Sequence, residues 1–399
     1  MKHNTPPQTD EELSILMPCL NEAETLANCI QEAQRFLSTS GIKGEVVIAD
    51  NGSSDGSVEL AESLGARVVR VSVRGYGAAL YFGSLACRGN YIIMADSDGS
   101  YDLEHLASFV EQLRLGKDLV MGNRFRGEIK PGAMPWKNRY IGNPTLSFIG
   151  RLLFGSRLGD FHCGIRGYRR DAFMKLNLRT TGMEFASEMA IKAQVMGLNI
   201  VEVPTILRPD GRSRPPHLRP WRDGWRHLRF MLLFSPSWLF VYPGIAVTVI
   251  FTIVAGLVTA PVGELLGECV RIRAIILSCA LVLAGVQSSI FGGFLLVFSM
   301  VEGLRPQRAS FMRIFDFINL EVGLILGGLV FSAGVVGIIL NIVAQGSSAL
   351  CDSLLVAMVP SVMMMVLGFQ VVVSSFFFSV LGMGLRRVPH PFEEIADGR

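Results

Sequence analysis

The chain has 399 residues, which is enough for two or three domains, and 50% of them are hydrophobic. Its mean hydropathy of +0.40 is too high for an ordinary water-soluble protein. The formal net charge of +3 is too small to indicate binding to nucleic acid. The composition therefore favours a membrane protein and argues against DNA or RNA as a partner.

Apolar and charged residues are unevenly distributed, and their distribution divides the chain. The first residues are polar and lack the hydrophobic stretch of a signal peptide. A mixed segment, a basic segment and a strongly apolar segment follow in turn. We therefore expect a polar tail, an α/β domain, a basic interfacial segment, a transmembrane domain and a cytoplasmic tail, over residues 1–12, 13–207, 208–230, 231–385 and 386–399.

Strands and helices alternate along the first half of the chain. Short apolar runs predict strands at 14–17, 45–49, 67–72, 91–95 and 119–122. Helical patterns lie between them, at 22–37, 58–64, 77–87 and 103–115. This order indicates a mostly parallel, Rossmann-like sheet with helices on both faces. Ligands of such sheets bind at the carboxyl ends of the strands.

The end of the fourth expected strand carries two acidic residues. Asp96 and Asp98 flank Ser97 directly after the apolar run 91–95. Side chains alternate along a strand, so both carboxylates point to the same side. Together they can bind one hard divalent cation, Mg²⁺ or Mn²⁺, which can in turn hold a diphosphate. Asp-x-Asp also occurs in solvated turns, and its position after a strand is what favours a site.

The first three expected strands also end in polar or glycine-rich turns. Asn21, after the first strand, can cap the helix that follows. Asp50, after the second, can accept a hydrogen bond from a base or ribose, or can serve only its own turn. The turn 74–79, after the third, could approach a diphosphate with its backbone N–H groups or be a plain loop.

Three polar groups follow further along the chain. Arg124 and Arg126 come directly after the fifth expected strand, and residues 160–168 form a loop that enters another strand. Glu184 and Glu188 open a helix, where acidic residues stabilise the helix dipole as readily as they serve a reaction.

The apolar half contains four stretches long enough to cross a hydrocarbon core, which takes about 20 apolar residues. Arginines follow the second and fourth stretches and are absent from the loop after the third. By the positive-inside rule, the α/β domain and the C-terminus then lie in the cytoplasm. The basic segment before the first stretch is expected to face anionic lipid headgroups. The stretches cover about 232–258, 274–300, 322–344 and 354–385.

These motifs together resemble family 2 glycosyltransferases of the polyprenyl-phosphate type, similar to dolichyl-phosphate mannose and glucose synthases, over about residues 13–230. The resemblance implies a GT-A catalytic domain and a Mg²⁺ or Mn²⁺ ion at Asp96 and Asp98. It implies a nucleotide-sugar site formed by Pro18, Leu20, Asn21, Glu22, Asp50, Asn51, Gly77, Asp96 and Ser97. It implies catalytic roles for Asp98, Arg124, Asp160 and Arg166, and an acceptor-phosphate site formed by Arg124, Arg126, Arg166, Ser213 and Arg214.

The chain departs from this family pattern at two places. Ser100 stands where some members have Gln, and Tyr76 stands where some have Lys between two glycines. Water or Ser100 would then complete the metal's coordination, and one phosphate contact of those members is missing.

The expected reaction moves one sugar from UDP-glucose, GDP-mannose or UDP-GlcNAc to a polyisoprenyl phosphate. A phosphate monoester has a second pKa of about 6, so it attacks largely ionised and requires no strong base. One alternative is a hydroxyl acceptor, which would require a base such as Asp160, Glu184 or Glu188. Another is a membrane protein that binds nucleotide sugars without catalysis. The sequence also leaves a homo-oligomer open.

Overall fold

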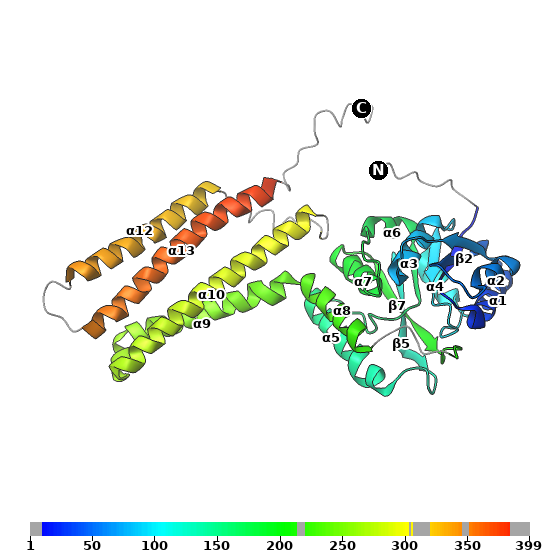
Figure 1. The fold of residues 1–399 in the computed structure, drawn as a ribbon, viewed down its shortest axis with the longest axis horizontal. Coiled ribbons are helices and arrows are strands. Elements are labelled where there is room, and N and C mark those ends of the chain that lie inside the picture. The colour runs from blue at the N-terminus through cyan, green and yellow to red at the C-terminus, as the bar shows by residue number, and fades with distance from the viewer. Residues whose placement is uncertain (1–9, 214–219, 303–304, 306–319, 345–350, 384–399) are drawn as a thin grey trace, which may run out of the picture. The chain divides into compact units, whose positions relative to one another are not determined.

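The computed structural model describes residues 10–213, 220–302, 305, 320–344 and 351–383. The chain divides into two compact units, with the boundary between Phe234 and Ser235 (Figure 1). The first unit contains the sheet, and the second is helical.

Seven strands form one sheet within the described part of the first unit, in the order β3-β2-β1-β4-β6-β5-β7. The pairs β1–β2, β2–β3, β1–β4 and β5–β7 are parallel, whereas β6 runs antiparallel between β4 and β5. This confirms the mostly parallel sheet that the sequence predicts. The strands are β1 Leu13–Cys19, β2 Gly44–Asp50, β3 Arg67–Arg70, β4 Tyr91–Met94, β5 Leu119–Ile129, β6 Arg166–Arg169 and β7 Ile200–Leu207.

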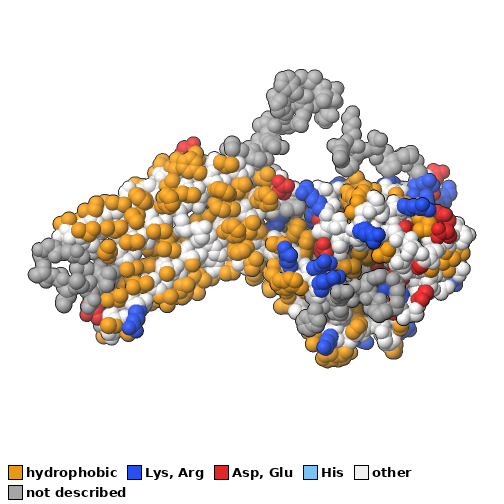
Figure 2. Space-filling view, viewed as in Figure 1, with side chains coloured by type: hydrophobic (Ala, Val, Ile, Leu, Met, Phe, Trp, Pro, Cys, Tyr) orange, Lys and Arg blue, Asp and Glu red, His pale blue; other side chains and the backbone are white. Residues whose placement is uncertain are grey.

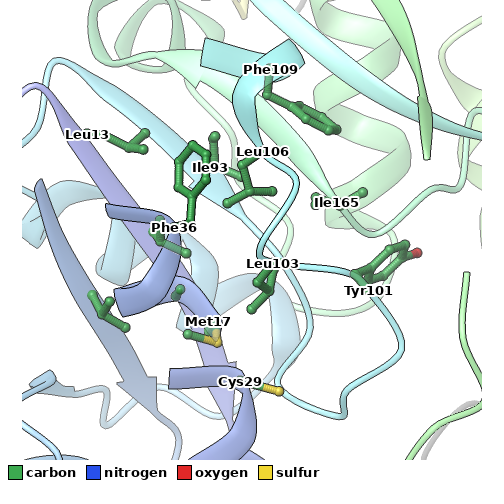
Figure 3. Close-up of a cluster of buried hydrophobic side chains, with 14 of the residues drawn as sticks. Leu13, Met17, Cys29, Phe36, Ile93, Tyr101, Leu103, Leu106, Phe109 and Ile165 are labelled. Atoms are coloured by element: carbon green, nitrogen blue, oxygen red, sulfur yellow. The ribbon is translucent and has the colours of Figure 1, made fainter. Parts of the chain in front are cut away.

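Helices cover both faces of the sheet because strand side chains alternate between the faces. In β1, Ile15 and Met17 contribute to one buried cluster and Leu16 to the other. The first cluster also takes side chains from α1 (Ala23–Ser40), α2 (Ser57–Ser63) and α4 (Ala107–Arg114), and Figure 3 shows its centre. The second takes side chains from α3 (Tyr76–Ala86), α6 (Arg170–Leu176), α7 (Phe185–Val195) and α8 (Pro220–Leu233).

Several elements of this unit are absent from the sequence prediction, among them α5 (Asn143–Phe154), α6 and β7. Strand β7 contains Pro204, which argues against a sheet strand, but β7 lies at the edge of the sheet, where a missing N–H is tolerated. Helix α5 has a proline in its first turn, a position that favours helix formation.

The second unit contains four apolar helices among its described residues, each long enough to cross a membrane. The helical elements that form them are η2 (Ser237–Val241), α9 (Tyr242–Thr259), α10 (Glu268–Val301), α12 (Leu320–Ala344) and α13 (Cys351–Met383). The first candidate span, Ser237–Thr259, consists of η2 and α9. The other three are Glu268–Val301 in α10, Leu320–Val343 in α12 and Val356–Gly382 in α13. Between 11% and 28% of each span is buried, and apolar side chains cover the visible face of the unit (Figure 2). Four apolar helices are therefore present in the regions where the sequence predicts spans. The first starts later than expected, because α8 ends at Leu233 and a new helical segment follows Pro236.

Glycines allow these helices to pack closely. A Cβ on Gly244 of α9 would lie 2.5 Å from the Ser289 hydroxyl of α10. A Cβ on Gly327 of α12 would lie 2.8 Å from a methyl of Val372 in α13. Small residues at such contacts are typical of membrane helix pairs.

Candidate active site

Two cavities meet at Asp96 and Asp98, just beyond the carboxyl end of β4. The first has a volume of about 510 Å³ and the second about 480 Å³. Both are lined by Tyr76, Asp96, Asp98, Met183 and Asp210. Of the residues predicted from the sequence, the first cavity also has Pro18, Leu20, Glu22, Asn51 and Ser97 in its wall, and the second also has Arg124. The carboxylate pair therefore lies where a molecule in one cavity can meet a molecule in the other.

Backbone and side-chain groups on two sides hold Asp98. Its Oδ1 accepts from the N–H of Ser100 at 3.0 Å, and its carbonyl accepts from the N–H of Gly211 at 2.9 Å. Its Oδ2 lies 3.2 Å from Nη2 of Arg212. Arg212 also donates from Nε to Oε2 of Glu22 at 2.9 Å. A positively charged group therefore already lies beside Asp98.

Asp96 is half-buried and is held by Tyr76, whose hydroxyl donates to Oδ1 at 2.9 Å. Burial and the neighbouring Asp98 raise the pKa of Asp96 to about 6, although the Tyr76 hydrogen bond acts in the opposite direction. Two carboxylates that resist simultaneous ionisation are stabilised by a cation between them.

The carboxylate pair fits a hard divalent cation that shares its coordination with a ligand. Among the described residues, no three His, Cys, Asp or Glu side chains converge on a complete metal site. Mg²⁺ does not need one, because it is commonly held by one or two carboxylates together with substrate phosphates and water. The neighbouring Arg212 guanidinium shows that Asp98 accepts positive charge at this place.

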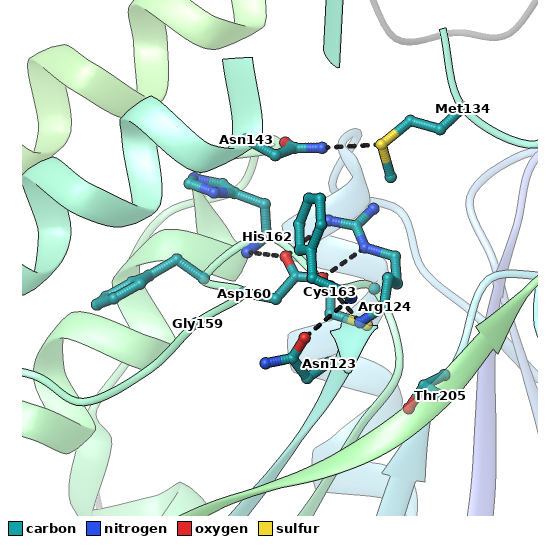
Figure 4. Close-up of polar contacts among 12 residues, drawn as sticks. Asn123, Arg124, Met134, Asn143, Gly159, Asp160, His162, Cys163 and Thr205 are labelled. Atoms are coloured by element: carbon teal, nitrogen blue, oxygen red, sulfur yellow. Dashed lines mark hydrogen bonds and ion pairs between the residues drawn. The ribbon is translucent and has the colours of Figure 1, made fainter. Parts of the chain in front are cut away.

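Arg124 approaches the second cavity from β5 and is paired with Asp160 (Figure 4). Nε of Arg124 lies 2.7 Å from Oδ2 of Asp160, and Nη2 lies 2.8 Å from Oδ1. Burial opposes the charge on the guanidinium, but the Asp160 carboxylate overrides this effect and raises the pKa of Arg124. Nη1 of Arg124 has no hydrogen-bond partner among the residues the structure describes. Arg124 therefore presents a permanent positive charge and a spare donor.

Known proteins share both halves of this arrangement. Residues 14–176 match the model of glycosyl transferase family 2, and residues 295–382 match the family 2 C-terminal transmembrane region. The chain is 38% identical over 375 residues to the low-salt glycan biosynthesis hexosyltransferase Agl6 of Haloferax volcanii, which covers 93% of this chain and 89% of that protein. The chain belongs to glycosyltransferase family 2.

Two further proteins match about half of this glycosyltransferase. A dolichyl-phosphate hexose transferase of Haloferax volcanii is 32% identical over 219 residues, which is 54% of this chain and 90% of that protein. The crystal structure of glucosyl-3-phosphoglycerate synthase from Mycobacterium tuberculosis is 21% identical, with 56% of this chain and 79% of that chain covered and a TM-score of 0.44.

Several residues expected at the nucleotide site support the backbone of this glycosyltransferase. Asn51 donates to the carbonyl of Val73 at 2.7 Å and accepts from the N–H of Gly75 at 2.7 Å, so it fixes the turn before α3. Asp50 accepts from the N–H of Gly52 at 3.0 Å within its own turn. Gly77 is covered by another loop, because a Cβ there would lie 2.6 Å from the carbonyl of Thr180.

Asn21 does not cap α1 as predicted. Its Oδ1 accepts from the N–H of Ser54 at 2.8 Å, and its backbone adopts a left-handed φ of 59°. At the start of the helix, Asp55 instead accepts from the N–H of Ala23 at 3.0 Å, and the hydroxyl of Ser57 accepts from the N–H of Glu22 at 3.0 Å. Residues 21–23 are thus tied to the loop after β2.

The contacts of Arg166 and Asp160 differ from those that their predicted roles require. Arg166 is fully buried and donates to three backbone carbonyls, those of Cys163 and Phe161 at 2.9 Å each and that of Ala186. It does not line either cavity, so the predicted phosphate contact is not seen. Asp160 is also fully buried, and both its carboxylate oxygens face Arg124, which leaves it unsuited to act as a base.

The remaining predicted residues of the acceptor site are dispersed. The side chain of Arg126 is 62% exposed, lies 3.7 Å from Glu202, and lines a hollow distinct from the two cavities. The hydroxyl of Ser213 donates to Glu24 at 2.6 Å, at the first turn of α1. Arg214 lies outside the described residues.

The structure adds residues that the sequence did not assign to the site. Arg74, Arg222 and Arg226 line the first cavity, and His162 and His227 line the second. Arg222 and Arg226 belong to the basic segment, which was expected to face lipid. The arginine excess of that segment could have indicated a diphosphate-binding site as well.

Proposed function

We propose that this membrane glycosyltransferase moves one sugar from a nucleotide-diphosphate sugar to a polyisoprenyl phosphate, with inversion at the anomeric carbon. The observation that carries the proposal is the position of Asp98, which lines both cavities. We assign the first cavity to the donor and the second to the acceptor phosphate. In-line attack requires two reactants on opposite sides of the reacting carbon, and two cavities that share Asp96 and Asp98 in their linings support such an arrangement.

The charged residues of the first cavity support its assignment to the donor. The first cavity is lined by Asp96 and Asp98 and by four arginines, Arg74, Arg212, Arg222 and Arg226. Arginine is well suited to bind phosphate oxygens in pairs. A Mg²⁺ or Mn²⁺ ion held by Asp96 and Asp98 would neutralise the departing diphosphate. The arginines would stabilise the negative charge of the same diphosphate.

The ionisation of a phosphate acceptor supports its assignment to the second cavity. A phosphate monoester carries its own nucleophilic oxygen and is largely ionised at neutral pH, so the site must only attract and orient it. Arg124 supplies a fixed positive charge at the second cavity, and Asp160 holds that charge in place. The four apolar helices would keep a lipid acceptor in the same membrane as the enzyme.

Family relatives agree with a lipid-linked reaction. One relative is named for a dolichyl-phosphate hexose transfer and another for glycan biosynthesis. We therefore propose a hexose as the sugar and glycan assembly as the process. We also propose that the first unit and the C-terminus lie in the cytoplasm, because arginines follow the second and fourth spans and are absent from the loop after the third.

A hydroxyl acceptor fits the site less well, because its attack requires a base. Asp160 is paired with Arg124, and Glu188 is paired with Lys192 at 2.8 Å in the interior. Glu184 has one buried oxygen without a partner among the described residues, but it lines neither cavity. Of the three predicted bases, Glu184 is therefore the one left to this alternative, and Asp210, which lines both cavities, is a further carboxylate available to it.

The decisive experiment is sugar transfer by the purified full chain in detergent. We expect radiolabel from a UDP- or GDP-hexose to enter an organic-extractable isoprenyl phosphate product only when Mn²⁺ or Mg²⁺ is present. Asp98→Asn should abolish this transfer, and Asp171→Asn, an exposed carboxylate on α6, should not. A panel of nucleotide sugars in thermal-shift assays would identify the donor by stabilisation. Transfer to a diacylglycerol that is lost in Glu184→Gln would favour the hydroxyl acceptor, and no transfer to any lipid would contradict an enzymatic role.

A further inference from the structure

The segment after β7 brings Arg212 to the carboxylates of the site. The N–H of Arg208 donates to the carbonyl of Ser100 at 2.8 Å, and the N–H of Gly211 donates to that of Asp98 at 2.9 Å. The hydroxyl of Ser213 donates to Glu24 at 2.6 Å. These contacts lie on both sides of Arg212, whose side chain is only 11% exposed. Its guanidinium is therefore held at the site by the backbone that carries it.

Arg212 bridges two acidic residues from different strand ends. Nη2 lies 2.9 Å from Oε1 of Glu22 and 3.2 Å from Oδ2 of Asp98, and Nε donates to Oε2 of Glu22 at 2.9 Å. Burial disfavours the charged guanidinium, but Asp98 and Glu22 outweigh it and raise the pKa of Arg212. Arg212 is thus the counter-ion of these carboxylates.

This contact affects how a divalent cation can reach Asp98. Oδ1 of Asp98 already accepts from Ser100, and Oδ2 faces Arg212. A cation that binds Oδ2 has the guanidinium as a neighbour, and the two positive charges repel in a partly buried site. A cation by itself is therefore expected to bind weakly.

A diphosphate changes this balance. Arg212 lines the first cavity, together with Arg74, Arg222 and Arg226. Phosphate oxygens placed there offer the guanidinium a two-point partner that replaces Asp98. Once Arg212 turns to the phosphates, Oδ2 is available to the cation, and the cation and the diphosphate then also attract each other directly.

We propose that Arg212 couples the two ligands: it occupies Asp98 while the donor is absent and moves to the diphosphate when the donor arrives, so that cation and donor bind cooperatively. The inference rests on the proposed function, because it assigns the first cavity to a nucleotide diphosphate. It adds a positioning role for Arg212, to which the sequence prediction gave no role.

The test measures the coupling directly. Titration calorimetry gives the affinity of the full chain for MnCl₂ alone, for UDP or GDP alone, and for each in the presence of the other. We expect the wild type to bind Mn²⁺ about tenfold or more tightly when the diphosphate is present, within the usual range of coupling between sites. In Arg212→Met, we expect the affinity for Mn²⁺ alone to rise about fivefold. The coupling factor, which is the ratio of the Mn²⁺ affinities with and without the diphosphate, should fall by a similar ratio.

Arg208→Met is the matched control. Arg208 belongs to the same segment and also lines the second cavity, but it pairs with Glu32 and Asp102, at 2.9 and 2.6 Å, rather than with Asp98. We expect its Mn²⁺ affinity and its coupling factor to equal those of the wild type. Arg212→Lys provides a second variant, in which the charge is kept and the two-point contact is lost, and weak binding of Mn²⁺ alone should persist there.

The outcomes separate the inference from the proposed function. Unchanged or weaker binding of Mn²⁺ alone in Arg212→Met would overturn the role of Arg212, even if sugar transfer is detected. An equal change in Arg208→Met would also overturn it, because any loosening of the segment would then suffice. A wild type that binds neither Mn²⁺ nor a nucleotide diphosphate would overturn the proposed donor site itself.

Discussion

Arg124 and Asp160 form a buried ion pair held at two points, with Nε 2.7 Å from Oδ2 and Nη2 2.8 Å from Oδ1. Glu202 on β7 fixes the loop that carries Asp160, because it accepts from the N–H groups of Gly159 and Asp160 at 2.7 and 2.9 Å. Arg124, which lines the second cavity, is thereby held in place through Asp160 by a residue of the edge strand β7. Asp160 is thus better explained as a residue that positions Arg124 than as a base.

We expect both partners of this pair to be required for stability. Removing one of them leaves a buried charge uncompensated, which typically costs about 3–5 kcal/mol. Asp160→Asn and Arg124→Met should each lower the melting temperature of the detergent-solubilised chain, and the double variant should lose less than the sum. The exposed pair Arg169–Asp171 is the control, with an expected effect of about 0–1 kcal/mol. Strictly additive losses would contradict a coupled pair.

We expect cation binding to depend on pH through Asp96. Its pKa is raised to about 6 by burial and by Asp98, so the carboxyl is protonated below that pH and competes with the cation. Mn²⁺ affinity, measured by calorimetry, should fall about tenfold for each pH unit below 6 and level off above 7. Asp96→Asn should remove this dependence, and Asp171→Asn should keep it. A flat wild-type profile would exclude Asp96 as a ligand.

We expect Gly164→Ala to disturb the carboxylate pair. A Cβ at Gly164 would lie 2.5 Å from Oδ2 of Asp96 and 3.1 Å from the Tyr101 hydroxyl. Such overpacking costs about 1–3 kcal/mol, and here moving Asp96 is one way to relieve it. Mn²⁺ affinity should therefore fall by about tenfold. Gly256→Ala is the control, because a Cβ there meets nothing within 4 Å. Wild-type affinity in Gly164→Ala would show that Asp96 does not move.

We expect Arg166→Met to affect folding rather than ligand binding. The substitution leaves three backbone carbonyls without their donor, at about 1–3 kcal/mol for each unsatisfied group. The melting temperature should fall, while the folded protein binds Mn²⁺ and the donor as the wild type does. An unchanged melting temperature together with weaker binding of isoprenyl phosphate would restore the phosphate contact that the sequence predicted for Arg166.

Local patterns in the sequence predicted most of the first unit. The apolar run of β4 ends at Met94, which places Asp96 and Asp98 just beyond a strand end, and their proximity to Pro18 and Leu20 follows from the parallel pairing of β1 with β4. Local patterns could not predict that Arg166 is buried. An arginine after a loop is normally solvated, and only the surrounding carbonyls make burial possible.

The sequence by itself determined the class of sheet, the four apolar spans and the pair of carboxylates, because hydrophobic periodicity and strand ends are local properties of the chain. Only the tertiary structure decided which charged side chains meet. Arg212 and Glu22 are 190 positions apart, and Arg124 and Asp160 meet through the antiparallel insertion of β6 between β4 and β5. Such contacts depend on strand order and on the balance between desolvation and pairing, which no short segment of sequence contains.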